Sequence, residues 1–161
     1  MTNPLLQDWT TPYEMPPFGD ITDDHFEEAV DAALAEARAN VAAIADSDAA
    51  PTFANTIEAL ERADETLGRV LGVFYTLAGT DANDRREALS RAFSPKLSAY
   101  GSEIASNAAL FSRIETLWQD RDTLDLTDEQ ARLLYLTRRS FVRRGAELDG
   151  IAKDRLAQVM E

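Results

Sequence analysis

The single histidine of the chain is the first residue to test for catalysis, because histidine is a common metal ligand and general base. His25 is followed by the letters F-E-E-A. The zinc-binding motif H-E-x-x-H needs a glutamate directly after the first histidine and a second histidine one helical turn on, and both are missing here. A Glu-x-x-His pair is missing too, since Thr22 stands three residues before His25. We therefore expect His25 to be an ordinary residue in the first turn of a helix.

Acidic side chains offer a second kind of chemistry, because two carboxylates at a suitable distance can act as acid and base. Candidates on predicted helix faces are Glu58, Glu61, Glu65 and Glu87. Such carboxylates are usually solvated, and we expect these to be solvated. Another acidic group opens a predicted helix and consists of Asp23, Asp24, Glu27 and Glu28. We expect this group to stabilise the helix start through the helix dipole. The alternative is a metal site, but the spacing of these residues does not fit an EF-hand loop.

One dense basic patch occurs in the chain, and it consists of Arg138, Arg139, Arg143 and Arg144. Arg139 and Arg143 are four residues apart and therefore share a helix face. We expect a solvated or salt-bridged face; the alternative is a docking surface for an acidic partner or for the remainder of a larger protein. The sequence contains no glycine-rich phosphate loop and no local signature of a serine or threonine nucleophile.

The composition narrows the function further. The 161 residues suit one domain or a piece of a larger one, and their formal net charge is −13. Clustered positive charge is what nucleic acids and anionic membranes attract, so neither is an expected partner. The absence of cysteine excludes disulfides, thiolate metal sites and cysteine nucleophiles. With 45% hydrophobic residues the chain can still bury a core.

The apolar spacing predicts an all-α fold of five to six helices in an antiparallel bundle or array. The first helix starts near Thr22 and runs to about Ile44. A long second helix starts at Thr52 or Asn55 and continues without a break to about Gly79. The third starts at Asn83 or Asp84 and runs to about Ile104, with a kink or break at Ser94–Pro95. The fourth is capped by Asn107, the fifth opens on a capping box of Thr127 with Gln130 and ends near Gly145, and a last stretch starts at about Ile151.

Residues 1–21 form a separate segment, because four of the six prolines lie in the first 17 residues. Proline fixes φ and removes a backbone donor, so we expect an extended arm with no element of its own. The arm should cross the helical part, residues 22–161, and be held there at its aromatics Trp9, Tyr13 and Phe18. Within the long second helix, Gly68 and Gly72 are expected to allow close helix packing.

Neither a signal peptide nor a membrane span is visible in the sequence, so the expected compartment is the cytoplasm. The first 20 residues carry no basic start and no long apolar run. The last residues remain within an amphipathic pattern that includes Leu156, Val159 and Met160, with no cap or polar tail after it. We expect a cut within a longer protein.

Several stretches together resemble the N-terminal region of the thimet oligopeptidase family of zinc metallopeptidases. They are PPFGDITDDHFEEAV, PTFANTIEALERADETLGRVLGVFYTL, NAALFSRIETLW and SFVRRGAEL. Within the family the likeness is greater to the bacterial peptidyl-dipeptidase (dipeptidyl carboxypeptidase) branch than to oligopeptidase A, and TLWQDRDTLDLTDEQARLL contributes to that distinction. The resemblance runs in order over nearly the whole chain.

The resemblance implies a parent enzyme that is two-lobed and mostly helical, with a channel that admits short unfolded peptides. The parent would hold zinc through a C-terminal motif and release dipeptides from the C-termini of oligopeptides. These 161 residues would form part of the channel wall, with no activity of their own. No catalytic, cofactor-binding or metal-ligating residue of the family maps onto any position here. We therefore predict no such residue in these 161 positions, and the resemblance implies that zinc is bound by the rest of the parent enzyme.

The partners implied are the missing C-terminal catalytic region and an oligopeptide substrate. A homodimer through the apolar face left by that missing region is also expected. Two other functions stay open: a free-standing acidic bundle that binds partner proteins, and an independent hydrolase with paired carboxylates, which no spacing supports. The reading frame beyond Glu161 separates the peptidase hypothesis from the free-standing bundle.

Overall fold

The computed structural model describes residues 2–148 and Arg155, and it confirms the all-α prediction. No strand occurs within these residues, and five of their α-helices have twelve residues or more. The helical stretch expected from Ile151 onward lies outside the described part. The chain divides into two compact units. The first unit is Met1–Asn40 with Arg62–Tyr100, and the second is Val41–Glu61 with Gly101–Glu161.

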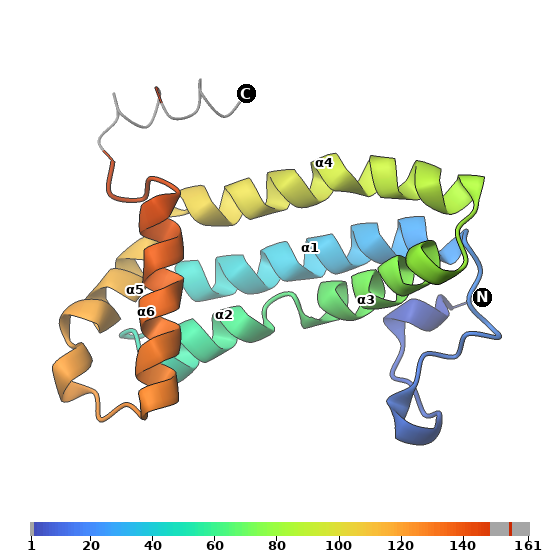
Figure 1. Cartoon of the computed structure of the whole chain (residues 1–161). Coiled ribbons are helices and arrows are strands. Elements are labelled where there is room, and N and C mark those ends of the chain that lie inside the picture. Colours follow the sequence, from blue (N-terminus) through green and yellow to red (C-terminus); the bar gives the residue numbers. More distant parts are fainter. Residues whose placement is uncertain (1, 149–154, 156–161) are drawn as a thin grey trace. The chain divides into compact units, whose positions relative to one another are not determined.

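Three successive antiparallel helices build the first unit: α1 (His25–Ala45), α3 (Glu65–Thr80) and α4 (Asp84–Ser106), of which α1 and α4 end in the second unit (Figure 1). One phenylalanine from each helix meets at the centre. Phe74 contacts Phe26 edge-on at 5.1 Å between ring centroids and Phe93 at 5.0 Å, and all three are fully buried. Burying each ring contributes about 1.5–3 kcal/mol, and the edge-to-face geometry suits their quadrupoles. This cluster is the core of the first unit.

The N-terminal arm is attached at its aliphatic start. Leu5 is fully buried, and Asn3 Nδ2 donates to the carbonyl of His25 at 2.8 Å. Of the aromatics, Trp9 lies under the Arg69 guanidinium at 5.0 Å, but Tyr13 is 96% exposed and Phe18 is exposed too. Two short 3₁₀ turns, η1 (Pro4–Leu6) and η2 (Pro12–Glu14), interrupt the arm. The prediction that the arm forms no element and is held at its aromatics was therefore wrong, except for Trp9, because proline at the first helical position also favours such turns.

The long second helix predicted from Thr52 to Gly79 is interrupted, which corrects the sequence expectation. It consists of a π-helical segment η3 (Phe53–Glu58), a short α2 (Ala59–Arg62) and α3. Between α2 and α3, the carbonyl of Ala63 accepts a hydrogen bond from Asn40 Nδ2 at 3.0 Å. Because that partner comes from α1, which is distant in sequence, the local helical pattern gives no sign of the interruption.

Two further expectations concerned helix interiors. α4 is continuous through Pro95, so of the kink or break expected at Ser94–Pro95 the break does not occur. Pro95 lies on the exposed side, where the carbonyl that loses its donor can bind water, while Phe93 is buried on the other side. Gly68 and Gly72 have no atom within 4 Å of an added Cβ, so neither makes a close packing contact. Both glycines face solvent.

The second unit is built on α5 (Ala108–Gln119) and α6 (Asp128–Arg143), joined through the 3₁₀ turn η4 (Arg121–Thr123). Phe111 stacks on Phe141, and Trp118 contacts Tyr135, each at 6.0 Å between centroids. Partner numbers rise along α5 as they fall along α6, so the two helices are antiparallel.

Both helix starts in this hairpin are capped as predicted. Asn107 Oδ1 accepts from the amide of Leu110 at 2.9 Å, and Thr127 with Gln130 forms a complete capping box. Gly145 follows α6 with φ of 91°, a conformation that favours glycine.

Candidate functional site

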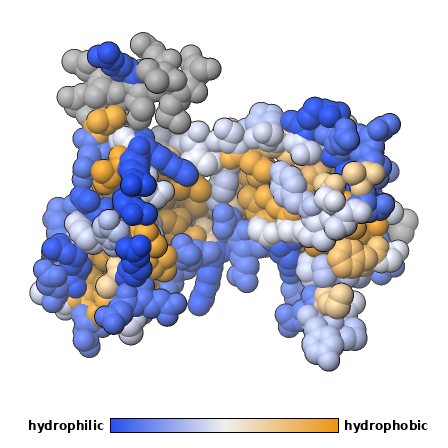
Figure 2. Space-filling view, viewed as in Figure 1, coloured by the Kyte–Doolittle hydropathy of each residue, from blue (hydrophilic) through white to orange (hydrophobic). Residues whose placement is uncertain are grey.

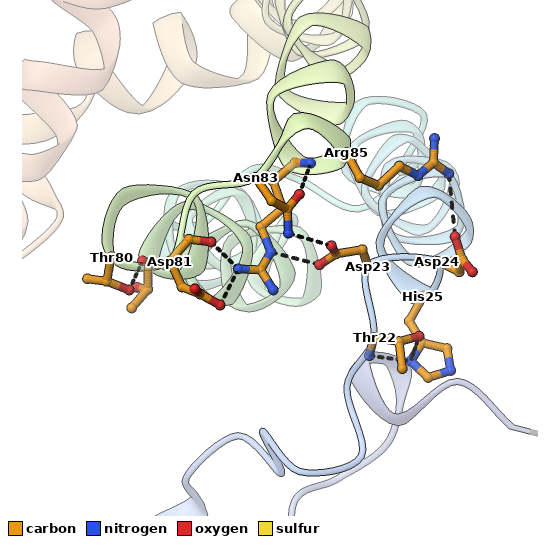
Figure 3. A network of polar contacts seen from close by, with 10 residues as sticks. Thr22, Asp23, Asp24, His25, Thr80, Asp81, Asn83 and Arg85 are labelled. Carbon is orange, nitrogen blue, oxygen red and sulfur yellow. Dashed lines mark hydrogen bonds and ion pairs between the residues drawn. The ribbon is translucent and has the colours of Figure 1, made fainter.

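A polar network joins the start of α1, the end of α3 and the start of α4 within the first unit (Figure 3). We call Asp23, Asp81, Asn83 and Arg86 the Asp23 network. The Asp23 carboxylate accepts from Arg86 Nε at 2.7 Å and from Asn83 Nδ2 at 2.9 Å. Arg86 Nη1 donates to Asp81 Oδ2 at 2.9 Å and to the Asp81 carbonyl. Asn83 Oδ1 accepts from the amide of Arg86 at 2.8 Å, so it also caps α4.

The network shifts the pKa of two of its members. Burial raises the pKa of the Asp23 carboxyl, but hydrogen bonds from Asn83 and Arg86 and the charge of Arg86 outweigh burial, so the pKa lies below its usual value. Hydrogen bonds to Asp81 and then to Asp23 raise the pKa of Arg86. Both groups are therefore held in their charged forms, which suits a network that joins helices.

The acidic group at the start of α1 forms ion pairs with α4 in addition to its expected interaction with the helix dipole. Glu27 and Glu28 lie in the first turn, as expected. Asp24 and Glu27 also face Arg85 of α4, at 3.7 and 3.4 Å from its Nη2. These ion pairs are exposed, and each contributes at most about 1 kcal/mol.

His25 is the first residue of α1, which confirms the first-turn prediction. Its Nδ1 accepts from the amide of Thr22 at 3.0 Å and lies 3.2 Å from the Thr22 hydroxyl (Figure 3). Of the carboxylates considered as acid and base, Glu61, Glu65 and Glu87 are exposed as expected, and Glu58 is half-buried. Glu87 faces Arg91 one turn along α4 at 3.6 Å.

Zinc does not fit the donors that these residues offer. The chain has no cysteine and one histidine, whose Nδ1 is already engaged by Thr22. Among residues 2–148 and Arg155, no three His, Cys, Asp or Glu side chains gather as a metal site requires. None of the helices in this described part has the length and hydropathy needed to cross a membrane.

The basic patch divides into two parts on α6. Arg138 is salt-bridged: its Nε donates to Glu115 at 2.7 Å and its Nη2 to Glu147 at 2.6 Å. Hydrogen bonding to Glu115 is the main cause of a raised Arg138 pKa. The other three arginines, with two neighbours, line a cavity of about 240 Å³ that we call the arginine cavity. Its residues are Leu136, Arg139, Ser140, Arg143 and Arg144. Arg139 and Arg143 therefore share a face, as their spacing predicted.

A buried arginine holds the segment after α1 in the second unit, and no sequence pattern indicates it. Arg113 is 7% exposed, and its Nη1 donates to the carbonyls of Ser47 and Ala49, both at 2.9 Å. Its Nη2 donates to Asn55 Oδ1 at 3.1 Å. The same Oδ1 accepts from the Thr52 amide at 2.8 Å and completes the capping box of η3. We call these contacts the Arg113 clamp.

Comparison with known proteins shows that the chain is similar to bacterial peptidases. It is 40% identical over 155 residues to a dipeptidyl carboxypeptidase of Salmonella typhimurium, and 38% identical over 154 residues to one of Escherichia coli. Each match covers 96% of this chain and 23% of the relative. An oligopeptidase A of Escherichia coli is 31% identical over 152 residues, which cover 94% of this chain and 21% of that protein. No protein-family profile matches the chain.

These matches confirm the resemblance to dipeptidyl carboxypeptidase and oligopeptidase A, and they are consistent with an N-terminal region. Identity is higher to the two dipeptidyl carboxypeptidases than to the oligopeptidase, which is the order that the sequence motifs indicated. The chain spans about a quarter of the length of these curated relatives.

Proposed function

We propose that these residues form the N-terminal helical part of a zinc peptidyl-dipeptidase and contribute to the wall of its substrate channel. The observation that carries the proposal is 40% identity to a dipeptidyl carboxypeptidase over 96% of the chain. The first unit supplies what a wall needs: three antiparallel helices around the Phe26–Phe74–Phe93 cluster, fastened at one end by the Asp23 network. The proposed partners are the remaining catalytic region and an oligopeptide substrate.

We propose further that the chain has no peptidase activity of its own and that the zinc of the parent is bound elsewhere. The donor set supports this, because the lone His25 is bonded to Thr22 and no H-E-x-x-H occurs in the sequence. A cytoplasmic location stays a prediction.

Incubation of the purified chain with zinc and a fluorogenic oligopeptide that has a free C-terminus tests this proposal. We expect no release of a C-terminal dipeptide and no zinc-dependent rise in Tm. A matched His25→Ala preparation controls for contaminating peptidases. Zinc-dependent cleavage that is present in the chain and lost in the variant would contradict the proposal.

A homodimer of the chain is part of the proposal as well. Figure 2 shows apolar groups at the surface within each unit, surrounded by hydrophilic ones. Large hydrophobic side chains that are at least a third exposed include Tyr13, Met15, Phe18, Tyr75, Tyr135 and Leu148. Sedimentation over a range of concentrations should show self-association of the chain; a monomer at the highest concentration would count against the dimer.

A further inference from the structure

Several cations of this acidic chain lie against carboxylates, and the arginines of the cavity do not. Arg86 is paired with Asp23 and Asp81, Lys96 with Asp31. On α6 itself, Arg138 takes up two carboxylates, Glu115 and Glu147. Within the described residues, Arg139, Arg143 and Arg144 form no ion pair, although the chain has 29 aspartates and glutamates to offer.

The contacts that these three arginines do make use few of their donors. The Arg139 guanidinium lies 5.3 Å from the centre of the Tyr135 ring, a cation–π contact that uses no N–H group. Arg144 Nη1 donates to the carbonyl of Gly101 at 3.4 Å, which is a long hydrogen bond. Arg143 is exposed. Each guanidinium has five N–H donors, so most of the arginine N–H groups around the cavity have no acceptor within the described part of the protein.

The spacing along α6 explains how the side chains converge. Leu136, Arg139, Ser140 and Arg143 stand at positions i, i+3, i+4 and i+7, so they lie on one face, and Arg144 extends it at the helix end. The helix dipole favours cations at the last turn of a helix, and this offsets part of the repulsion between the clustered arginines. Within the described residues, however, the one hydrogen bond from these guanidinium groups goes to Gly101 and none goes to the carbonyls of that turn, and the Ser140 hydroxyl adds another donor on the same cavity.

We propose that the arginine cavity is a binding site for a small oxyanion that carries two or more negative charges. Guanidinium groups bind carboxylate and phosphate oxygens through paired N–H donors, and a multivalent anion meets several of them at once. The cavity of about 240 Å³ suits a compact ion more than a drug-sized molecule. The shared chemistry is that of phosphate and of di- or tricarboxylates. A long polyanion such as nucleic acid is disfavoured because the chain as a whole carries a charge of −13.

Titration of the whole 161-residue chain with inorganic phosphate and with citrate, at constant ionic strength set by sodium chloride, tests the site. The readout is the NMR signal of the arginine Nε–H groups and of the Ser140 amide. We expect a saturable shift confined to residues around the cavity. Tighter binding of phosphate would assign the site to phosphate groups, and tighter binding of citrate would assign it to carboxylates. A linear shift with no saturation, or an equal effect of chloride, would overturn the proposal.

Two variants on α6 make the test specific. Arg143→Gln removes one charged fork from the cavity and keeps a good helix former, so it should weaken binding about tenfold. Arg132→Gln removes the same charge from an exposed position outside the cavity and should change the affinity less than about twofold. Circular dichroism confirms that both variants are folded. Equal affinities in these two folded variants would overturn the site.

An internal occupant is the remaining alternative, because Asp149, Asp154 and Glu161 follow α6 in the sequence. A chain with Asp149→Asn, Asp154→Asn and Glu161→Gln should bind phosphate or citrate with an affinity within about twofold of the unchanged chain. Binding that appears only after these three substitutions would overturn the proposal of an external anion. Neither result depends on the peptidase proposal, since both use the isolated chain and no activity.

Discussion

Two arginines, Arg86 in the first unit and Arg113 in the second, fix chain segments to one another in opposite ways. In the first unit, Arg86 meets the carboxylates Asp23 and Asp81. In the second unit, Arg113 is buried against two backbone carbonyls and one side-chain amide oxygen. Carboxylates titrate and carbonyls do not. The comparison teaches that the Arg86 contacts depend on pH through the Asp23 carboxyl, whose pKa is lowered, whereas the Arg113 clamp has no acceptor that titrates in the acid range.

Removal of the central ring of the first unit should have the largest effect on stability. Phe74→Ala takes away the ring that both Phe26 and Phe93 contact and leaves a cavity, so the free energy of unfolding should fall by about 3–5 kcal/mol. Urea denaturation measures this loss. The neighbouring Tyr75→Ala, at an exposed position, is the control and should cost about 1 kcal/mol. Similar losses for the two variants would show that the phenylalanine cluster is not the core.

Removal of the buried cation in the second unit should come next. Arg113→Met keeps an unbranched apolar stem but leaves the carbonyls of Ser47 and Ala49 without their donor, at a cost of about 3 kcal/mol. Arg132→Met, in the same unit and exposed, should cost less than about 0.5 kcal/mol. Urea midpoints of the two proteins provide the measurement. A loss for Arg113→Met as small as that of its control would mean that the clamp contributes little.

The Asp23 network should show the pH dependence that the comparison predicts. The pKa of Asp23 is lowered in the folded protein, so its contribution is complete above the unfolded value of about 3.9 and is lost as the pH falls through the folded value. Asp23→Asn should therefore cost about 1–2 kcal/mol at pH 7 and approach no cost as the pH falls to about 2.

Unfolding free energies of both proteins between pH 7 and pH 2 test this. The cost of Arg113→Met, measured in the same series, should stay constant because its acceptors do not titrate. A cost of Asp23→Asn that is also constant with pH would remove the distinction between the Arg86 contacts and the Arg113 clamp.

The smallest effects should be gains at glycines in α3. Gly68→Ala and Gly72→Ala meet no atom within 4 Å and remove backbone entropy from the unfolded chain, so each should stabilise the protein by about 0.5–1 kcal/mol. Gly145→Ala is the opposite case, because a residue with a side chain is strained at the φ of 91° found there. The substitution should destabilise the second unit by about 1 kcal/mol. Thermal denaturation separates these signs. A loss at Gly68 or Gly72 would indicate a packing role after all.

Features that depend on neighbouring residues could be predicted from the sequence. The Asn107 cap, the Thr127–Gln130 capping box and the glycine after α6 are set within a few residues, and all occur. The shared face of Arg139 and Arg143 follows from helix geometry alone. Such features need only the local backbone, so tertiary packing does not override them.

Features that depend on partners distant in sequence could not be predicted. At the interruption before α3 the Ala63 carbonyl accepts from Asn40 of another helix, and the Arg113 clamp uses backbone carbonyls, which leave no pattern in the sequence. The ion pair of Asp23 with Arg86 joins positions more than sixty residues apart. The acidic group in the sequence therefore predicted a helix start but not the network. The arm aromatics were misjudged because burial is decided by the surface that the arm meets.

The reading frame beyond codon 161 tests the central proposal, that these helices belong to a larger zinc peptidase. Sequencing of the native gene and the mass of the native protein give the answer directly. We predict that the frame continues to a length about four times that of this chain, in keeping with the 23% of each dipeptidyl carboxypeptidase that the match covers, and that it contains an H-E-x-x-H motif. A stop codon directly after Glu161, with a native protein of 17.8 kDa, would contradict the proposal.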